Sequence, residues 1–147
     1  MKKNFSKIPY GKNVYDKREV KAVVQTLKNS TQMGKAVNSF ENKVAKTFSK
    51  KYGLMVNSGS SALILAIQVM NLKKGSEIIT PCLNFGTAVS SIILNNLNPV
   101  LVDCKINTLQ IDPDKIEEKI SRKTKAILVP NLIGNVPDWS KLRKIAK

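Results

Sequence analysis

Apolar residues in the first third of the chain recur every three or four positions, which predicts two amphipathic helices. The first begins after Asp16, a residue type that caps helices well. The second is predicted over residues 38–52, and Gly53 is positioned to end it. Residues 29–34 form the predicted loop between them. The apolar positions that define the two helices are Val20, Val23, Val24, Leu27, Val37, Phe40, Val44 and Phe48.

From Leu54 onward, short apolar runs alternate with helical stripes. The runs are rich in Val and Ile, which is typical of strands that are covered on both faces. The predicted strands are residues 54–57, 77–80, 99–103 and 126–129. The predicted helices are residues 60–70, residues 87–96, a segment capped by Asp112 with Pro113 first and Ile116 and Ile120 facing inward, and residues 137–147. This order predicts an α/β domain with a mostly parallel sheet and flanking helices.

Two regions follow from this pattern. Residues 1–36 are predicted to form an extended segment, up to about Gly11, and the first helix. Residues 37–147 are predicted to form the first part of a larger α/β domain. The sequence ends within a predicted helix with no further strand after it, so we expect that domain to be incomplete.

The charge of the chain is strongly positive: 25 Lys and Arg against 10 Asp and Glu give a formal net charge of +15. Such a charge is typical of proteins that bind nucleic acid. However, 22 of the basic residues are Lys and 3 are Arg, and they are scattered along the whole chain. Nucleic-acid sites favour clustered residues and Arg. A basic nucleic-acid-binding module is therefore kept as an alternative, and we expect no nucleic-acid partner.

Histidine is absent, which excludes Ser-His-Asp triads, His general bases and His metal sites within these 147 residues. Cys82 and Cys104 are too few for a disulfide framework or a four-cysteine metal site, and they fit a reducing compartment. The basic N-terminus lacks the apolar segment of a signal peptide. No apolar run approaches the about 18 residues that span a bilayer, so we expect a cytoplasmic protein with no membrane partner.

A turn between a predicted strand and a predicted helix carries Gly59, Ser60 and Ser61. Free N–H groups at the start of a helix bind anions, and the two hydroxyls add further donors. This pattern favours a phosphate site, and an ordinary Ser cap after a Gly turn is the structural alternative. The turn is neither a P-loop nor a dinucleotide-binding fingerprint, because the required Lys and Gly spacings are missing.

Further polar loops follow the other strands, so they lie at the same end of a parallel sheet. Phe85 is a lone aromatic there, suited either to stack on a flat cofactor or to plug a helix start. Asp103 either contacts a ligand or caps its loop. Asn131 and Asn135 either contact a ligand or form a turn. Cys82 has no basic neighbour in sequence to lower its pKa, so we interpret it as a structural thiol.

The order and spacing of these motifs resemble the N-terminal part of the DegT/StrS family of PLP-dependent sugar aminotransferases. Nearly the whole chain takes part in the resemblance. The matching positions are residues 8–11, 32–34, 40–41, 56–63, 75–81, 85, 99–103, 111–113, 124–127, 132–135 and 138.

The resemblance implies the large domain of a fold-type-I transferase, a homodimer with active sites at the subunit interface, and pyridoxal 5'-phosphate (PLP) as cofactor. By position, Gly59, Ser60 and Ser61 would hold the cofactor phosphate, and Phe85 would stack on the pyridine ring. Asn131 stands where family members often have His, and it is expected with Asn135 on the substrate side. None of the 22 lysines matches the family's lysine context. The Schiff-base lysine is therefore expected beyond residue 147, which leaves no catalytic residue within this chain.

The reaction that the resemblance implies is transfer of an amino group from an amino acid, commonly glutamate, to a keto-sugar nucleotide. Such reactions serve polysaccharide biosynthesis. The related sugar 3-dehydratases use the same fold and cofactor to remove a hydroxyl, and the Gly-Ser-Ser turn and Gly134–Asn135 are similar to theirs. An inactive structural remnant is a further alternative.

Overall fold

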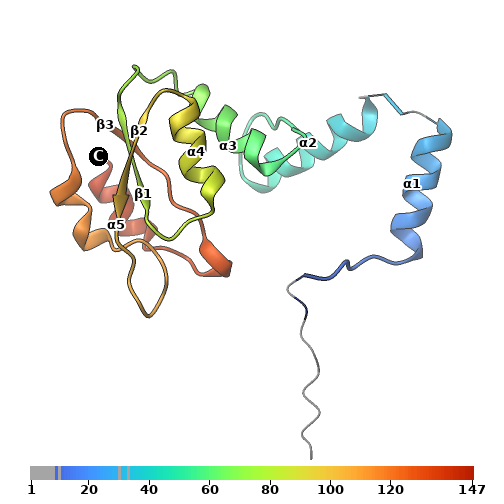
Figure 1. Cartoon of the computed structure of the whole chain (residues 1–147). Coiled ribbons are helices and arrows are strands. Elements are labelled where there is room, and N and C mark those ends of the chain that lie inside the picture. The colour runs from blue at the N-terminus through green and yellow to red at the C-terminus, as the bar shows by residue number, and fades with distance from the viewer. Residues whose placement is uncertain (1–8, 10, 30, 33) are drawn as a thin grey trace, which may run out of the picture. The chain divides into compact units, whose positions relative to one another are not determined.

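The computed structural model of this chain describes residues 9, 11–29, 31–32 and 34–147. The described residues divide into two units, one that ends at residue 55 and one that comprises residues 56–147 (Figure 1). Most of the predicted extended segment, residues 1–8 and 10, lies outside the described residues, as do residues 30 and 33 of the predicted loop.

The first unit contains two helices, α1 (Lys17–Asn29) and α2 (Lys35–Thr47). Asp16 caps α1 as predicted, because its Oδ1 accepts the Arg18 N–H at 2.7 Å. The helix predicted over residues 38–52 starts and ends earlier than expected. It stops before Ser49, whose φ of 52° lies in the left-handed region, so the prediction that Gly53 ends the helix is wrong.

Gly53 is needed for a different reason. A Cβ at this position would lie 2.6 Å from the carbonyl oxygen of Glu41, closer than any real contact. Two residues later, the Met55 N–H donates to Oε1 of the same Glu41 at 2.8 Å. The chain after α2 therefore runs back closely along the helix, and only glycine fits at the point of nearest approach.

The second unit is built on a three-stranded parallel sheet (Figure 1). Its strands are β1 (Glu77–Pro81), β2 (Asn98–Val102) and β3 (Thr124–Ile127), in the spatial order β2-β1-β3. All three predicted strands at these positions are confirmed. The register pairs Ile79 with Val100 on one side and with Ile127 on the other.

Helices and turns cover the two faces of this sheet. On one face, α3 (Gly59–Gln68) and α4 (Gly86–Leu94) pack Ile67 and Ile92 against Ile78. On the other face, α5 (Trp139–Ile145) packs Leu142 against Ile79. Neighbouring residues of β1 thus serve opposite cores, as the alternation of side chains along a strand requires. The predicted α/β layering is confirmed.

The segment predicted as a helix after Asp112 forms two 3-10 turns instead, Pro113–Lys115 and Glu117–Lys119. The cap is as predicted, since Asp112 Oδ1 accepts the Asp114 N–H at 3.1 Å. Ile116 lies between the turns and is fully buried, whereas Ile120 is 45% exposed and does not face inward. Burial of Ile116 alone does not require a continuous helix, because the two short turns already place this side chain in the core.

The predicted strand over residues 54–57 is also wrong, because this segment has no regular structure. Leu54 is 77% exposed and Met55 is 49% exposed. A strand requires a hydrogen-bonded neighbour, and no described segment pairs with this one. In the described part of the chain, none of the helices has the length and apolar character needed to cross a bilayer.

Candidate functional site

The N-terminus of α3 is the first part of the candidate site. Ser58 caps it in an extended conformation, and its Oγ accepts the Ser61 N–H at 3.1 Å. The Ala62 N–H donates to the Ser58 carbonyl at 3.1 Å. Because α-helices leave their first amides without acceptors, the Gly59 and Ser60 N–H groups have no acceptor among the described residues. These two amides are free to bind an anion.

An open hollow of about 590 Å³ brings this helix start together with the loop after β1. Gly59 and Ser60 line it from α3, and Phe85 and Thr87 line it from the start of α4. The remaining lining is apolar and comes from Ala62, Leu63 and Ala66. Its volume lies within the range of ordinary small-molecule sites.

Phe85 and Gly59 leave room for a ligand in this hollow. Phe85 is 71% exposed, so packing within the second unit leaves most of its ring uncovered. A Cβ added at Gly59 would meet no atom within 4 Å. The lining of the hollow therefore includes two residues whose amides lack acceptors among the described residues, and one exposed aromatic side chain.

Ser61 faces a different environment from Gly59 and Ser60. Its Oγ donates to Asn57 Oδ1 at 2.7 Å and accepts from Ser58 Oγ at 3.1 Å. Ser61 lines a separate small hollow with Val56 and Asn57, not the one that Phe85 borders. In this structure Ser61 fixes the turn before α3, and its assignment to the phosphate stays a prediction.

Asn131 and Asn135 lie at the 3-10 turn Leu132–Gly134, away from the Phe85 hollow. The Asn131 carbonyl accepts the Gly134 N–H at 3.2 Å, and Asn135 Nδ2 donates to the Thr108 carbonyl at 2.8 Å. Both residues are exposed. They support turns here, and a substrate role for them also stays a prediction.

Cys82 and Asp103 lie together at the carboxyl ends of β1 and β2. Cys82 Sγ is 3.6 Å from Asp103 Oδ1, and Lys115 Nζ is 3.1 Å from Asp103 Oδ2. Desolvation, together with the nearby Cys104 thiol and Asp103 carboxylate, raises the pKa of Cys82 above its ordinary value. The hydrogen bond and charge of Lys115 lower the pKa of Asp103. A thiol with a raised pKa is a poor nucleophile, which agrees with a structural role for Cys82.

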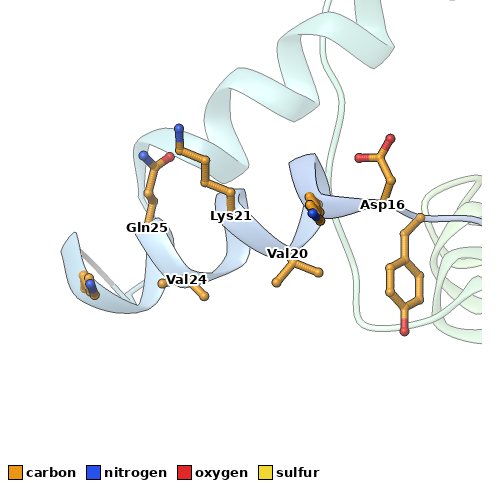
Figure 2. A pocket seen from close by; sticks show the side chains of 8 residues that line it. Asp16, Val20, Lys21, Val24 and Gln25 are labelled. Carbon is orange, nitrogen blue, oxygen red and sulfur yellow. The ribbon is translucent and has the colours of Figure 1, made fainter.

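A second hollow, of about 660 Å³, lies along α1 (Figure 2). Its lining includes the apolar side chains of Val20 and Val24 and the polar side chains of Asp16, Lys21 and Gln25, which Figure 2 labels. All of its lining residues come from the single stretch 15–28. Since no polar groups from other elements converge on it, it lacks the character of a cofactor site.

Three supporting residues were not found from the sequence. Ser58 caps α3, Thr87 lines the hollow, and Asn84 holds the loop that carries Phe85. Ser58 could have been found, because a Ser before the first turn of a helix is a standard cap signal. The role of Thr87 depends on its spatial neighbours in α3, whereas Asn84 bonds to Thr80 and Phe85, which are close to it in sequence.

Comparison with known proteins identifies the family. The family model of the DegT/DnrJ/EryC1/StrS aminotransferase family matches residues 13–147. The chain belongs to this family.

Relatives within the DegT/DnrJ/EryC1/StrS family include both dehydratases and transaminases. The GDP-4-keto-6-deoxy-D-mannose 3-dehydratase of Escherichia coli O55:H7 is 38% identical over 144 residues, which cover 93% of this chain and 37% of that protein. The dTDP-3-amino-3,6-dideoxy-alpha-D-galactopyranose transaminase of Aneurinibacillus thermoaerophilus is 41% identical over 115 residues, which cover 78% of this chain and 32% of that protein. The matched part of the chain thus spans about a third of the length of these relatives.

A solved structure of this family has the same fold as the chain. The E. coli GDP-4-keto-6-deoxy-D-mannose-3-dehydratase with bound hydrated PLP aligns with a TM-score of 0.87 and 38% identity. The alignment covers 93% of this chain and 37% of that one. The predicted fold class, the PLP-dependent sugar aminotransferase fold, is confirmed.

Proposed function

We propose that this chain provides the phosphate and ring contacts for PLP in an enzyme that acts on keto-sugar nucleotides. The observation that carries the proposal is the hollow shared by the Gly59 and Ser60 amides and the Phe85 ring. PLP joins an anionic phosphate to a flat aromatic ring, so one hollow with free amides and an uncovered aromatic suits both parts. When bound, PLP acts as an electron sink for chemistry on the substrate.

The residues of this chain would bind and orient the cofactor. The Gly59 and Ser60 N–H groups would donate to the phosphate, helped by the positive end of the α3 dipole and the Ser60 hydroxyl. Phe85 would cover one face of the ring and exclude water from it. A Schiff-base lysine and an interface between two copies of the protein are expected to complete the site.

Cofactor binding can be tested on the chain itself with pyridoxamine 5'-phosphate (PMP), which lacks the aldehyde that reacts with surface lysines. Amide NMR spectra recorded during a PMP titration are expected to shift the signals of Gly59, Ser60 and Phe85. Inorganic phosphate is expected to shift those of Gly59 and Ser60 and to compete with PMP. Saturating PMP without any shift at these three residues would refute the proposed site.

Two reactions are candidates for the enzyme as a whole. Amino transfer, commonly from glutamate, to the keto group is the reaction implied by the resemblance. Removal of the 3-hydroxyl is the second candidate, favoured by the 38% identity to a 3-dehydratase over 93% of this chain. Mass spectrometry of a GDP-4-keto-6-deoxymannose incubation with PLP and glutamate separates them, because one product gains an amino group and the other loses a hydroxyl.

A further inference from the structure

Asn84 joins the loop after β1 to the buried end of that strand. Its Nδ2 donates to Thr80 Oγ1 at 3.0 Å, and its Oδ1 accepts the Phe85 backbone N–H at 2.8 Å. A backbone N–H can only donate, so this contact fixes which end of the Asn84 amide faces Phe85. Thr80 is fully buried in β1, which makes it a rigid anchor for the loop.

The Phe85 ring depends on its backbone for its position. At 71% exposed, the side chain is not held by packing. Phe85 is the residue before the first turn of α4, its own side chain makes no cap bond, and Gly86 follows it. The Asn84 contact fixes the Phe85 amide, while the Phe85 carbonyl accepts the Ala88 N–H at 2.9 Å.

We infer that Asn84 is a positioning residue of the cofactor site. Its two hydrogen bonds tie the Phe85 backbone to the rigid end of β1 and thereby hold the Phe85 ring in position. The inference rests on the proposed function, because that function supplies the PLP ring on which Phe85 would stack. A stacking ring must be held at a defined height and angle over its partner, and an exposed side chain on an untethered loop would lose entropy on binding. Asn84 removes that cost by holding the backbone in place beforehand.

The inference predicts a separation between ring binding and phosphate binding. Asn84→Ala is expected to weaken PMP binding about threefold to tenfold, the effect of losing a hydrogen-bonded tether. Affinity for inorganic phosphate, which the α3 amides bind without Phe85, is expected to stay unchanged. Asn84→Asp keeps acceptors for Phe85 N–H and for the Thr80 hydroxyl, so it is expected to restore the ratio of the two affinities.

The decisive experiment is a double-mutant cycle of Asn84→Ala and Phe85→Ala, with PMP and phosphate affinities measured by calorimetry on the full chain. Because Asn84 acts through Phe85, the double variant is expected to bind PMP as Phe85→Ala alone does. Additive losses, or an Asn84→Ala variant with wild-type PMP affinity, would overturn the inference and leave the proposed function intact. A wild-type chain that binds neither probe would refute the proposed function itself, and Asn84 with it. Circular dichroism checks that each variant is folded.

Discussion

Ser60 and Phe85 border one hollow, although Ser60 lies in the first turn of α3 and Phe85 precedes α4. The two helices lie on the same face of the sheet, and Asn95, which follows the last residue of α4, ties them together by donating to the Ile64 carbonyl at 3.2 Å. This packing brings a free amide and an uncovered ring to one place.

The Ser60 amide can be deleted without removing the helix. Proline is tolerated in the first turn of a helix, so Ser60→Pro is expected to stay folded while losing the N–H donor. Phosphate and PMP affinities are expected to fall about tenfold, since a hydrogen bond to a charged group is lost. Ser60→Ala, which keeps the amide, is the matched control. It is expected to lose clearly less affinity for phosphate and PMP than Ser60→Pro does. Equal losses in the two variants would mean that the hydroxyl, not the amide, binds the phosphate.

Phe85→Ala is expected to weaken PMP binding about tenfold without lowering thermal stability, because stacking is lost while the exposed ring contributes little to the core. Calorimetry measures the first effect and circular dichroism the second. Phe48→Ala removes an equally exposed ring, 69% against 71%, from the other unit. This control is expected to bind PMP as the wild type does, and a comparable loss in both variants would contradict a specific role for Phe85.

Truncation of the two neighbouring isoleucines of α4 should change the free energy of unfolding to very different extents. Ile92 is fully buried between α4 and the sheet, whereas Ile93 is 56% exposed. Ile92→Ala is expected to lower the free energy of unfolding by about 3 kcal/mol, through lost burial and a residual cavity. Ile93→Ala is expected to change it by less than about 1 kcal/mol. Urea denaturation measures both, and similar values would contradict the packing of α4 described above.

Gly53→Ala is expected to destabilise the first unit, because the added methyl would meet the Glu41 backbone. The chain must shift to relieve this contact, at a cost of about 1–3 kcal/mol. Gly11→Ala is the control, since a Cβ there meets nothing within 4 Å. Hydrogen exchange of the α2 amides reports the change locally. Unchanged exchange in Gly53→Ala would mean that the segment after α2 is not held against the helix.

The ion pairs of Asp114 should make stability fall in acid. The hydrogen bonds of Lys141 and Lys105 lower the pKa of Asp114 below its ordinary value of 3.8. A carboxyl with a lowered pKa stabilises the fold at pH values above its ordinary pKa. This contribution is lost as the pH falls through the lowered pKa. Asp114→Asn is expected to melt a few degrees lower at neutral pH at most, since the pairs are exposed. In strong acid, its melting temperature should equal that of the wild type, and a difference that persists there would contradict an ionic cause.

Local sequence signals predicted most of the second unit correctly. The apolar runs predict β1, β2 and β3, and Asp112 caps the segment that follows it as predicted. Gly59, Ser60 and Phe85 were also selected from the sequence, because a glycine turn, a helix start and a lone aromatic are local features. The suitability of these residues for binding a phosphate or a flat ring can be recognised without knowing which residues lie near them in space.

The errors arose where a segment's structure depends on a distant partner. Residues 54–57 have the composition of a strand but no described strand beside them, so their backbone does not join a sheet. Gly53 follows a predicted helix in sequence, yet its need for glycine comes from Glu41. Ile116 is buried by two short turns where the periodicity suggested a full helix.

The sequence by itself determined the family, the α/β alternation and the residue types suited to a phosphate and a flat ring, because these depend on order, spacing and side-chain chemistry. Only the tertiary structure decided that Gly59, Ser60 and Phe85 share a hollow while Ser61 turns to Asn57. It also decided that Asn84 links Phe85 to the buried Thr80. The shared hollow depends on the packing of α3 and α4 on one face of the sheet, and helix packing sets distances that residue order alone does not specify. The bonds of Ser61 and Asn84 are short in sequence, and they depend on the backbone geometry of the turns that precede α3 and α4.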